Sequence, residues 1–248
     1  MFDSYADIFS QRSRSYHGAM QRVPRARDAE FNAAIAPIED SPAGLVCDMP
    51  SGGCYLASYL PDRMDYIGVD PVEDFGGSPR TKSQRVLTAP LTDVPLDDGS
   101  VDYVINLAGL HHEEDLEPVF REVRRLVAPG GIAVFADGAA DTPPARFLNG
   151  FVARNNPLGH DGRFLDARTA DLLEAAGFAV ADDELLVIPW GFGSVAEAGD
   201  FCRELFGITG ASSEEVTEAL NSEIGFDVVE GAGVRLRWML RRIVCKAI

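Results

Sequence analysis

Short apolar runs rich in β-branched residues alternate, over most of the chain, with longer stretches in which apolar residues recur every three or four positions. Runs of this length predict buried strands, and the periodic stretches between them predict amphipathic helices. The alternation predicts an α/β fold with a doubly wound, mostly parallel sheet that carries helices on both faces. The strand-like runs cover residues 44–48, 65–70, 84–88, 101–107 and 130–137.

The stretch from 115 to 127 gives the clearest helical signal. Asp115 is a suitable N-cap, and the Pro-Gly-Gly run at 129–131 is expected to stop the helix. The apolar positions fall on one face and would pack on the sheet. They are Leu116, Val119, Phe120, Val123 and Leu126.

The pattern divides the chain at about residue 40. Residues 1–40 look helical and are split by Pro24, so they predict an N-terminal helical cap. Residues 41–248 form the main domain, and a helical lid insertion is expected at about 190–224. Outside the strands already given, this domain has predicted helices at 144–155, 165–177, 197–208 and 212–225, and predicted strands at 178–190 and 234–247.

Charge and apolar content narrow the classes of function. The 248 residues are 46% hydrophobic and carry 39 acidic against 22 basic side chains, a net charge of −17. Such a field repels phosphate backbones and anionic lipid surfaces, so neither nucleic acid nor a membrane is an expected partner. No apolar run approaches the roughly 20 residues that span a bilayer. The four cysteines have no metal-ligand spacing and no histidine beside them, which predicts a cytoplasmic protein with reduced thiols and no metal.

Two acidic residues follow predicted strands at the edge where α/β folds bind ligands. Asp48 ends the first strand and precedes the Gly52-Gly53 turn, where the absence of side chains lets the backbone approach a ligand. Asp70 ends the second strand, at the interval where an acid accepts ribose hydroxyls in nucleotide-binding folds. The alternative for Gly52-Gly53 is an ordinary turn, and the alternative for Asp70 is an N-cap on the next helix.

The segment PLTDVPLDDGSVDYVINLAGLHHEEDLEPVFREVRRLVAPGGIAVFAD, residues 90–137, resembles the class I S-adenosylmethionine-dependent methyltransferases throughout its length. The resemblance extends in weaker form from Asp48 to the last strand. It implies a Rossmann-like, seven-stranded sheet with the last strand antiparallel, a methyltransferase domain over residues 41–248, and S-adenosyl-L-methionine as the cofactor.

The resemblance also implies a set of cofactor contacts. Asp48 and Gly52 would lie by the methionine part, Asp70 would hold the ribose, Leu91 would flank the adenine, and Asn106 would sit beneath the cofactor. The full set of expected cofactor-binding residues is Asp48, Pro50, Gly52, Asp70, Pro71, Leu91, Asn106 and Leu107.

Three positions depart from the family pattern. Pro50 and Cys54 stand where the turn usually has glycines, and Pro90 stands where the family often has Asp. Adenine recognition is therefore expected to rely on backbone groups and packing. The departures keep open a non-catalytic, methyltransferase-like binding or regulatory protein.

Catalysis of methyl transfer depends mainly on alignment and exclusion of water, and a base is needed only when the acceptor must lose a proton. His111 and His112 follow the fourth strand at the ligand-binding edge and are the candidate bases. The alternative is that either imidazole caps the helix that begins near Asp115.

The acceptor is predicted to be a small molecule, methylated on oxygen or nitrogen in secondary or specialised metabolism. Trp190 and Phe192, between the expected hinges Gly191 and Gly193, would cover an apolar pocket. The predicted acceptor-binding residues are Tyr16, His17, His160, Trp190 and Phe192.

Other classes remain in competition. A nicotinamide-dependent oxidoreductase would need G-x-G-x-x-G at the first turn, which PSGGCY does not supply. An RNA or protein methyltransferase has support only from the N-terminal arginines. The sequence also leaves open whether the chain forms a homodimer.

Overall fold

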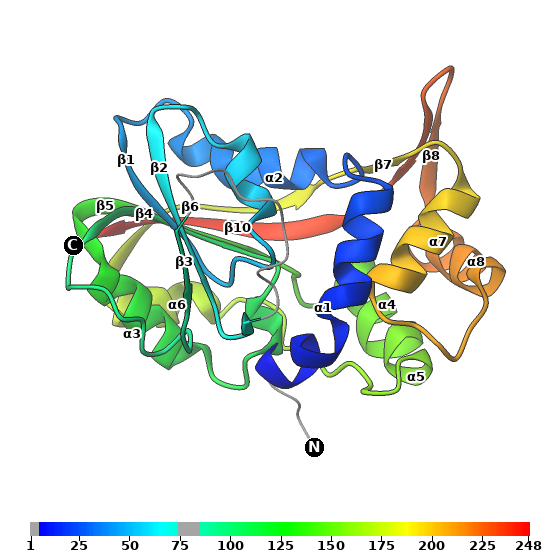
Figure 1. Ribbon diagram of the computed structural model, residues 1–248, viewed down its shortest axis with the longest axis horizontal. Helices are drawn as coiled ribbons and strands as arrows, with labels where there is room; N and C mark the ends of the chain where they lie inside the picture. The colour runs from blue at the N-terminus through cyan, green and yellow to red at the C-terminus, as the bar shows by residue number, and fades with distance from the viewer. Residues whose placement is uncertain (1–4, 74–84) are drawn as a thin grey trace.

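The computed structural model describes residues 5–73 and 85–248. Seven of the described strands form one sheet in the order β3-β2-β1-β4-β5-β10-β6 (Figure 1). The predicted strand at 84–88 begins with Gln84, which lies outside the described residues. The bounds are β1 Gly44–Asp48, β2 Met64–Asp70, β3 Arg85–Thr88, β4 Val101–Leu107, β5 Val127–Asp137, β6 Phe178–Val187 and β10 Met239–Ala247.

The pairing of these strands confirms the predicted fold class. β1 pairs in parallel with β2 and β4, and the pairs β2–β3 and β4–β5 are parallel as well. β10 is antiparallel to both of its neighbours, β5 and β6. The sheet is therefore seven-stranded and mostly parallel, with its last strand antiparallel, as in the Rossmann-like methyltransferase fold.

Successive side chains of a strand point to opposite faces of the sheet. Both faces are buried under helices. Val46 and Ile105 belong to one apolar cluster, and their strand neighbours Cys47 and Val104 belong to the other. Helix α2 (Asp28–Ile35), continued by the 3₁₀ helix η1 (Ala36–Ile38), covers the first face, while α3 (Leu116–Leu126) and α6 (Thr169–Ala175) cover the second (Figure 1).

The beginning of α3 is as predicted, but its end is not. The Asp115 side chain accepts a hydrogen bond from the Glu117 amide and caps the helix. The helix ends at Leu126, ahead of the predicted Pro-Gly-Gly stop, because Val127 already pairs with Val101 as the start of β5. The stop signal at 129–131 therefore lies within the strand.

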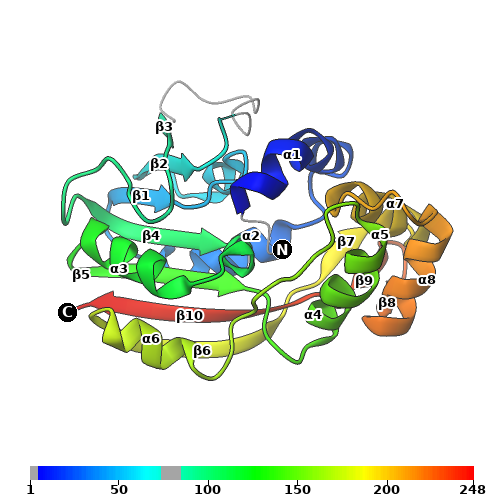
Figure 2. The ribbon, with the colours of Figure 1, turned by 90° about the horizontal axis from the view of Figure 1, so that it is seen from below.

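The remaining helices gather beyond the carboxyl ends of the parallel strands, the end to which the arrowheads of β4 and β5 point in Figure 2. Ser194 caps α7, and Ser212 with Glu215 forms a capping box on α8. These two helices pack on each other, and α7 also packs on α1. Their bounds are α1 Tyr5–Arg22, α4 Pro143–Phe147, the π-helical η5 Leu148–Val152, α5 Ala153–Asn155, α7 Val195–Leu205 and α8 Ser213–Glu223.

A second, three-stranded sheet corrects the prediction of a single final strand. β7 (Trp190–Phe192), β9 (Gly233–Leu236) and β8 (Phe226–Val229) lie in the order β7-β9-β8. The segment expected as one strand at 234–247 is thus divided between β9 and β10, which belong to different sheets. The chain turns at Trp238, whose carbonyl accepts from the Ile188 amide and whose ring stacks on Trp190 at 4.3 Å.

Over residues 5–73 and 85–248, no helix combines the length and apolar character that crossing a membrane requires. The four cysteines are all buried and free.

Candidate active site

The turn after β1 runs across the carboxyl ends of β1 and β2. Gly52 and Gly53 have positive φ angles of 51° and 92°, and Cys54 has one of 63°. Only glycine adopts this conformation without strain. After Cys54 the chain forms a short 3₁₀ helix, η2 (Tyr55–Tyr59).

The carboxylate of Asp70, at the end of β2, is anchored by this turn and by α1. Its Oδ2 accepts from the Gly52 amide at 2.9 Å and from the Tyr5 hydroxyl at 3.2 Å, and its Oδ1 accepts from the Val72 amide at 2.9 Å. Burial raises the pKa of Asp70 to about 6, against the effect of these hydrogen bonds. The carboxylate is thus oriented beside Tyr5 and Gly52, both of which line a cavity.

The first cavity lies where the first turn, the end of β4 and helix α1 meet. Two polar atoms at this edge, Ser51 Oγ and Asn106 Oδ1, are buried without a hydrogen-bonding partner in the described residues. The lining residues are Tyr5, Phe9, Tyr16, Arg27, Phe31, Asp48, Pro50, Ser51, Gly52, Tyr55, Leu56, Leu107 and Ala108.

A second cavity adjoins the first, and most of the surface that lines it is apolar. It lies between α1, the turn after β4 and the small sheet. The lining residues are Phe9, Arg12, Tyr16, Arg27, Glu30, Ala108, His111, His112, Asp137, Gly138, Pro144, Leu148, His160, Trp190, Leu205, Phe206, Trp238 and Leu240. Phe9, Tyr16, Arg27 and Ala108 line both cavities, so the two share a wall.

A buried ion pair stiffens that shared wall. Arg27 donates from Nε and Nη2 to the two carboxylate oxygens of Glu30, at 2.7 and 2.8 Å, and from Nη1 to the Tyr16 hydroxyl at 2.7 Å. Its guanidinium also lies 5.3 Å from the Trp190 ring. The charge of Arg27 is therefore compensated, and its planar group is held between aromatic rings.

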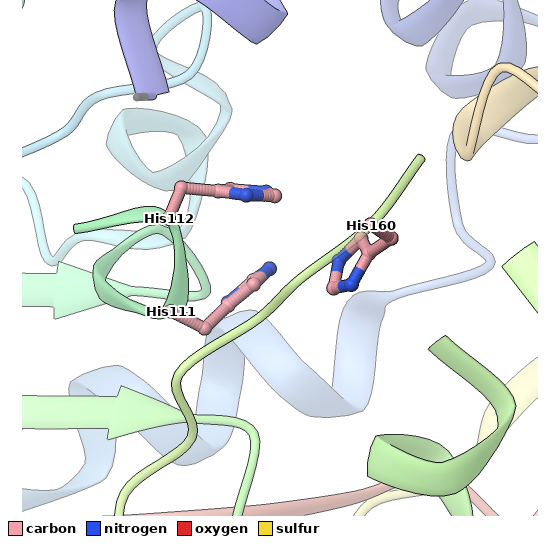
Figure 3. A group of neighbouring side chains, drawn as sticks. All are labelled: His111, His112 and His160. Carbon is pink, nitrogen blue, oxygen red and sulfur yellow. The ribbon is translucent and has the colours of Figure 1, made fainter. Parts of the chain in front are cut away.

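Three histidines lie at the far side of the second cavity (Figure 3). His111 and His112 form the end of the 3₁₀ helix η4 (Leu110–His112), and His160 faces them from a loop. The ring Nδ1 of His111 lies 2.6 Å from Asp137 Oδ1, and the ring Nδ1 of His160 lies 2.8 Å from Asn149 Oδ1. Burial, and then the neighbouring His111, lower the pKa of both His112 and His160 well below the usual value, so both imidazoles are neutral.

Comparisons with known proteins agree with this geometry. Residues 47–135 match the family model described as a methyltransferase domain. An uncharacterized methyltransferase of Mycobacterium sp. (strain KMS) is 33% identical over 125 residues, 49% of each chain. A probable S-adenosylmethionine-dependent methyltransferase of Mycolicibacterium smegmatis is 31% identical over 141 residues, 54% of this chain and 53% of the relative. A solved structure of a SAM-dependent methyltransferase from Thermotoga maritima superposes with a TM-score of 0.64 at 17% identity, over 97% of this chain and 99% of that one.

The chain carries a methyltransferase domain at residues 47–135, within the fold of the class I S-adenosylmethionine-dependent methyltransferases. S-adenosylmethionine is the cofactor named for one of these relatives. The polar groups of the first cavity suit that molecule, because Asp70 is held at its edge, and Ser51 Oγ and the nearby Asn106 Oδ1 have no hydrogen-bonding partner among the described residues. The matches span about half the length of the curated relatives.

The expected cofactor-binding residues of the methyltransferase are only partly brought together. Asp48, Pro50, Gly52 and Leu107 line the first cavity, and Asp70 lies at its edge through its bond to Gly52. Asn106 lies beneath the turn, where its amide donates to the Met49 carbonyl. Two others lie outside the walls of both cavities. Leu91 is buried in an apolar cluster, and Pro71 is half-buried after β2.

Asp48 is held away from solvent by a second strand. Its Oδ2 accepts from the Tyr66 hydroxyl at 2.8 Å, and burial raises the pKa of Asp48 well above its usual value. The cavity therefore has one carboxyl group at each of two strand ends, both of which titrate above the ordinary range of aspartate.

Only some of the predicted acceptor-binding residues line the second cavity. Tyr16, His160 and Trp190 line the second cavity. His17 does not, because its ring bonds to the Tyr55 hydroxyl at 2.7 Å, away from that cavity. Phe192 is also outside the cavity wall, since it is buried against Phe201 at 5.3 Å.

The predicted hinges of the lid are tied into the structure. Gly191 donates its amide to the Ala26 carbonyl and pairs with Arg235 of β9, and the Gly193 amide donates to Glu197. These bonds make β7 a sheet strand that braces the cavity.

Several residues of the site escape sequence reasoning. Tyr5, Arg12, Arg27 and Trp238 reach the cavities from elements far apart in the chain, and their local sequence gives no sign of this. Asp137 could have been found, because it ends β5 as Asp48 and Asp70 end their strands. Spacing along the sequence also gives no sign that ring nitrogens of His111, His112 and His160 lie within 4.8 Å of one another.

The N-terminal arginines are divided between the cavity wall and the surface. Arg12 and Arg27 are buried in the cavity wall. Arg22 and Arg25 are engaged by Glu204 and Asp28, each at 2.8 Å, and Arg14 is exposed.

Proposed function

We propose that this chain transfers a methyl group from S-adenosylmethionine to a small molecule bound in the second cavity. The observation that carries the proposal is the wall shared by the two cavities, formed by Phe9, Tyr16, Arg27 and Ala108. A ligand in each cavity would meet there, as a methyl donor and its acceptor must. The predominantly apolar lining of the second cavity supports a compact, partly aromatic acceptor.

When bound, the cofactor supplies a methyl carbon whose bond to the sulfonium sulfur breaks as the acceptor's lone pair forms the new bond, leaving a neutral thioether. The chain's own residues contribute by holding the cofactor in position. Asp70 would accept the two ribose hydroxyls on a carboxylate already oriented by Gly52 and Val72. Asp48 and the turn at Pro50 and Gly52 would hold the methionine end.

Helix α1 and the aromatic residues of the second cavity would exclude water from the reacting atoms. Tyr5 and Phe9 come from α1, and Trp190 comes from β7. Because positive charge disappears as the methyl group leaves sulfur, a dry apolar surround favours the transfer.

An acceptor that carries a proton on its oxygen or nitrogen must also lose it. We assign this step to the pair His111 and His112, with His111 as the base in contact with the acceptor. A carboxylate cannot donate, so the bond to Asp137 places the ring proton of His111 on Nδ1 and leaves Nε2 as the accepting atom. His112 is held neutral beside it.

The proposal includes methylation on oxygen or nitrogen in specialised metabolism. Buried, free cysteines and an acidic charge balance support a cytoplasmic setting. No observation favours a nucleic acid or a second copy of the chain as a partner.

The test is transfer of a deuterium-labelled methyl group from S-adenosylmethionine to a component of a metabolite extract, followed by mass spectrometry. Labelled product is expected with the wild-type protein, and His111→Ala should lower its rate by about 10²- to 10⁴-fold while S-adenosylhomocysteine still binds. His17→Ala is the matched control because His17 lies outside the second cavity. Cofactor binding without labelled product in any extract would instead identify a non-catalytic relative.

A further inference from the structure

Three of the four histidines of the chain meet in the second cavity, although His160 is 48 positions beyond His112 in the sequence. Each offers a ring nitrogen, and these nitrogens all lie within 4.8 Å of one another. The residues are buried, with 9% of His111, 5% of His112 and 9% of His160 exposed. Three imidazoles gathered at this spacing and depth need a physical reason.

We propose that His111, His112 and His160 bind a divalent transition metal of the zinc type, within the cavity to which the proposed function assigns the acceptor. Zinc binds imidazole nitrogen at about 2.0–2.1 Å, which separates two ligands of a tetrahedral site by about 3.3 Å. Nitrogens that lie within 4.8 Å reach that spacing by small side-chain rotations. Figure 3 shows that two ligands come from one turn and the third from the loop opposite.

The surroundings of the cluster match those of metal-binding histidines, which usually donate their second ring N–H to a carboxylate or carbonyl oxygen. His111 does so to Asp137, and His160 does so to the side-chain oxygen of Asn149. Asp137 also accepts from the His111 and Gly138 amides, and Asn149 also accepts from the Gly162 amide. Asp137 and Asn149 are therefore fixed in place. Each accepts a hydrogen bond from Nδ1 of its histidine, which leaves the Nε2 lone pair to bind a metal.

The donor set selects the class of ion. Three imidazole nitrogens suit Zn²⁺, Fe²⁺, Ni²⁺ or Cu²⁺, whereas Mg²⁺ and Ca²⁺ prefer oxygen ligands. Three protein ligands leave at least one position open, as in catalytic zinc sites. That position would face the second cavity and could take the oxygen, nitrogen or sulfur of an acceptor, lowering its pKa so that its proton leaves to solvent. With a metal bound, the histidines act as ligands and the base assigned to His111 is not needed.

The direct test is titration of chelator-treated protein with Co²⁺, followed by its visible absorption, in the absence of cofactor and acceptor. One Co²⁺ per chain is expected, with the intense bands of a four- or five-coordinate ion, and Zn²⁺ should displace it. His111→Ala and His160→Ala should abolish the bands. His17→Ala, which removes the remaining histidine of the chain, should leave them unchanged.

A second variant guards against failure of a histidine variant to fold. Asn149→Ala retains all three ligands and removes only the partner of His160, so Co²⁺ should bind about 10- to 100-fold more weakly. Binding below one ion per chain in the wild type, or equal loss in His17→Ala, would overturn the proposal. Unchanged affinity in Asn149→Ala would do the same.

The proposed metal site and the proposed function can be refuted independently of each other. S-adenosylhomocysteine should bind equally well to metal-free and Co²⁺-loaded protein, because the first cavity does not include the histidines. If Co²⁺ is not bound but labelled methyl is still transferred, the proposed function stands and the metal site is rejected. If Co²⁺ binds but no methyl is transferred, the metal site stands and the proposed function is rejected.

A different feature of the same cavity points to the charge of the acceptor. Arg12 is 8% exposed, and no carboxylate of the described chain lies within ion-pairing distance of it. Its Nη2 donates to the Leu205 carbonyl at 2.8 Å, while its Nε is buried without a partner. Burial lowers the pKa of Arg12 to about 10, which still leaves the group charged at neutral pH. A buried, uncompensated cation is costly unless a ligand completes its pairing.

We infer that Arg12 receives an anionic group, a carboxylate or a phosphate, of the acceptor in the second cavity. This inference rests on the proposed function for the place of the acceptor, but it does not depend on the metal site. Arg27, the other arginine of the cavity, cannot serve because Glu30 already accepts from its Nε and Nη2, and Tyr16 accepts from its Nη1.

The test compares carboxylic acids with their neutral amides, such as benzoate with benzamide and indole-3-acetate with indole-3-acetamide, by calorimetry in the presence of S-adenosylhomocysteine and chelator. At least one acid should bind about tenfold or more tightly than its amide. That preference should vanish in Arg12→Gln and partly return in Arg12→Lys. An equal affinity for acid and amide in every pair, or a preference that survives in Arg12→Gln, would overturn the inference, and neither result bears on whether methyl transfer occurs.

Discussion

The most informative single substitution is Asp70→Asn, because it changes the charge of the proposed ribose acceptor with little change in size. Asp70 is 1% exposed, and its two oxygens already accept from Gly52, Tyr5 and Val72. The asparagine retains one accepting oxygen and replaces the other with a donor. One charge-assisted bond to the cofactor is therefore lost, and the second becomes a neutral one.

The expected magnitude follows from those bonds. A hydrogen bond to a charged group contributes about 1.5–3 kcal/mol, which corresponds to roughly a 10- to 150-fold loss of affinity for S-adenosylhomocysteine. The substitution should also destabilise the free protein by about 1–3 kcal/mol, because the amide of Gly52 or Val72 loses its acceptor. The two effects are separable, since affinity is measured on the folded fraction.

Titration calorimetry with S-adenosylhomocysteine measures the affinity, and urea denaturation measures the free energy of unfolding. Asp65→Asn is the matched control, because Asp65 lies on the same strand and is exposed. Affinity within twofold of the wild type in Asp70→Asn would refute the assignment of Asp70 to the ribose. Asp70 would then serve only to order the turn after β1.

Three further results are expected. Because burial raises the pKa of Asp70 to about 6, the carboxylate takes up a proton as the pH is lowered through 6, and affinity for S-adenosylhomocysteine should fall. Calorimetry between pH 8 and 5 should show this decline in the wild type and not in Asp70→Asn. Trp190→Ala should lower the free energy of unfolding by about 3–5 kcal/mol, since the ring is buried against Trp238; a loss under about 1 kcal/mol in urea would contradict this packing. Glu30→Gln should cost about 3–5 kcal/mol by leaving Arg27 buried and unpaired, whereas Asp227→Asn, at an exposed ion pair, should leave the urea midpoint nearly unchanged.

Secondary structure was predictable wherever local chemistry and burial agreed. The strands at 44–48 and 101–107 and the helix after Asp115 are found where the pattern placed them, because each is apolar on the face that meets the core. The prediction is wrong at 234–247, where the alternation of Arg and apolar residues continues through two strands of different sheets. Residue-by-residue alternation carries no sign of a bend, and the bend at Trp238 comes from its stacking on Trp190.

The cofactor site was predictable in part for a similar reason. Asp48 and Asp70 end neighbouring parallel strands, and such ends meet at one edge of a doubly wound sheet. For Leu91, the resemblance gives the place in the sequence but not the direction of the side chain, which packs in an apolar cluster.

By itself the sequence determined the fold class, the strand ends that carry the acids, and the family, since these follow from periodicity and from a continuous stretch of residues. Only the tertiary structure decided which side chains share a cavity. The chain brings His160 to His111, and Arg12 and Arg27 to Trp190, across separations that no local pattern encodes. Burial then gives these groups their properties. Arg12 has no counter-ion among the described residues, and burial holds two imidazoles neutral; neither outcome can be read from residue identity alone.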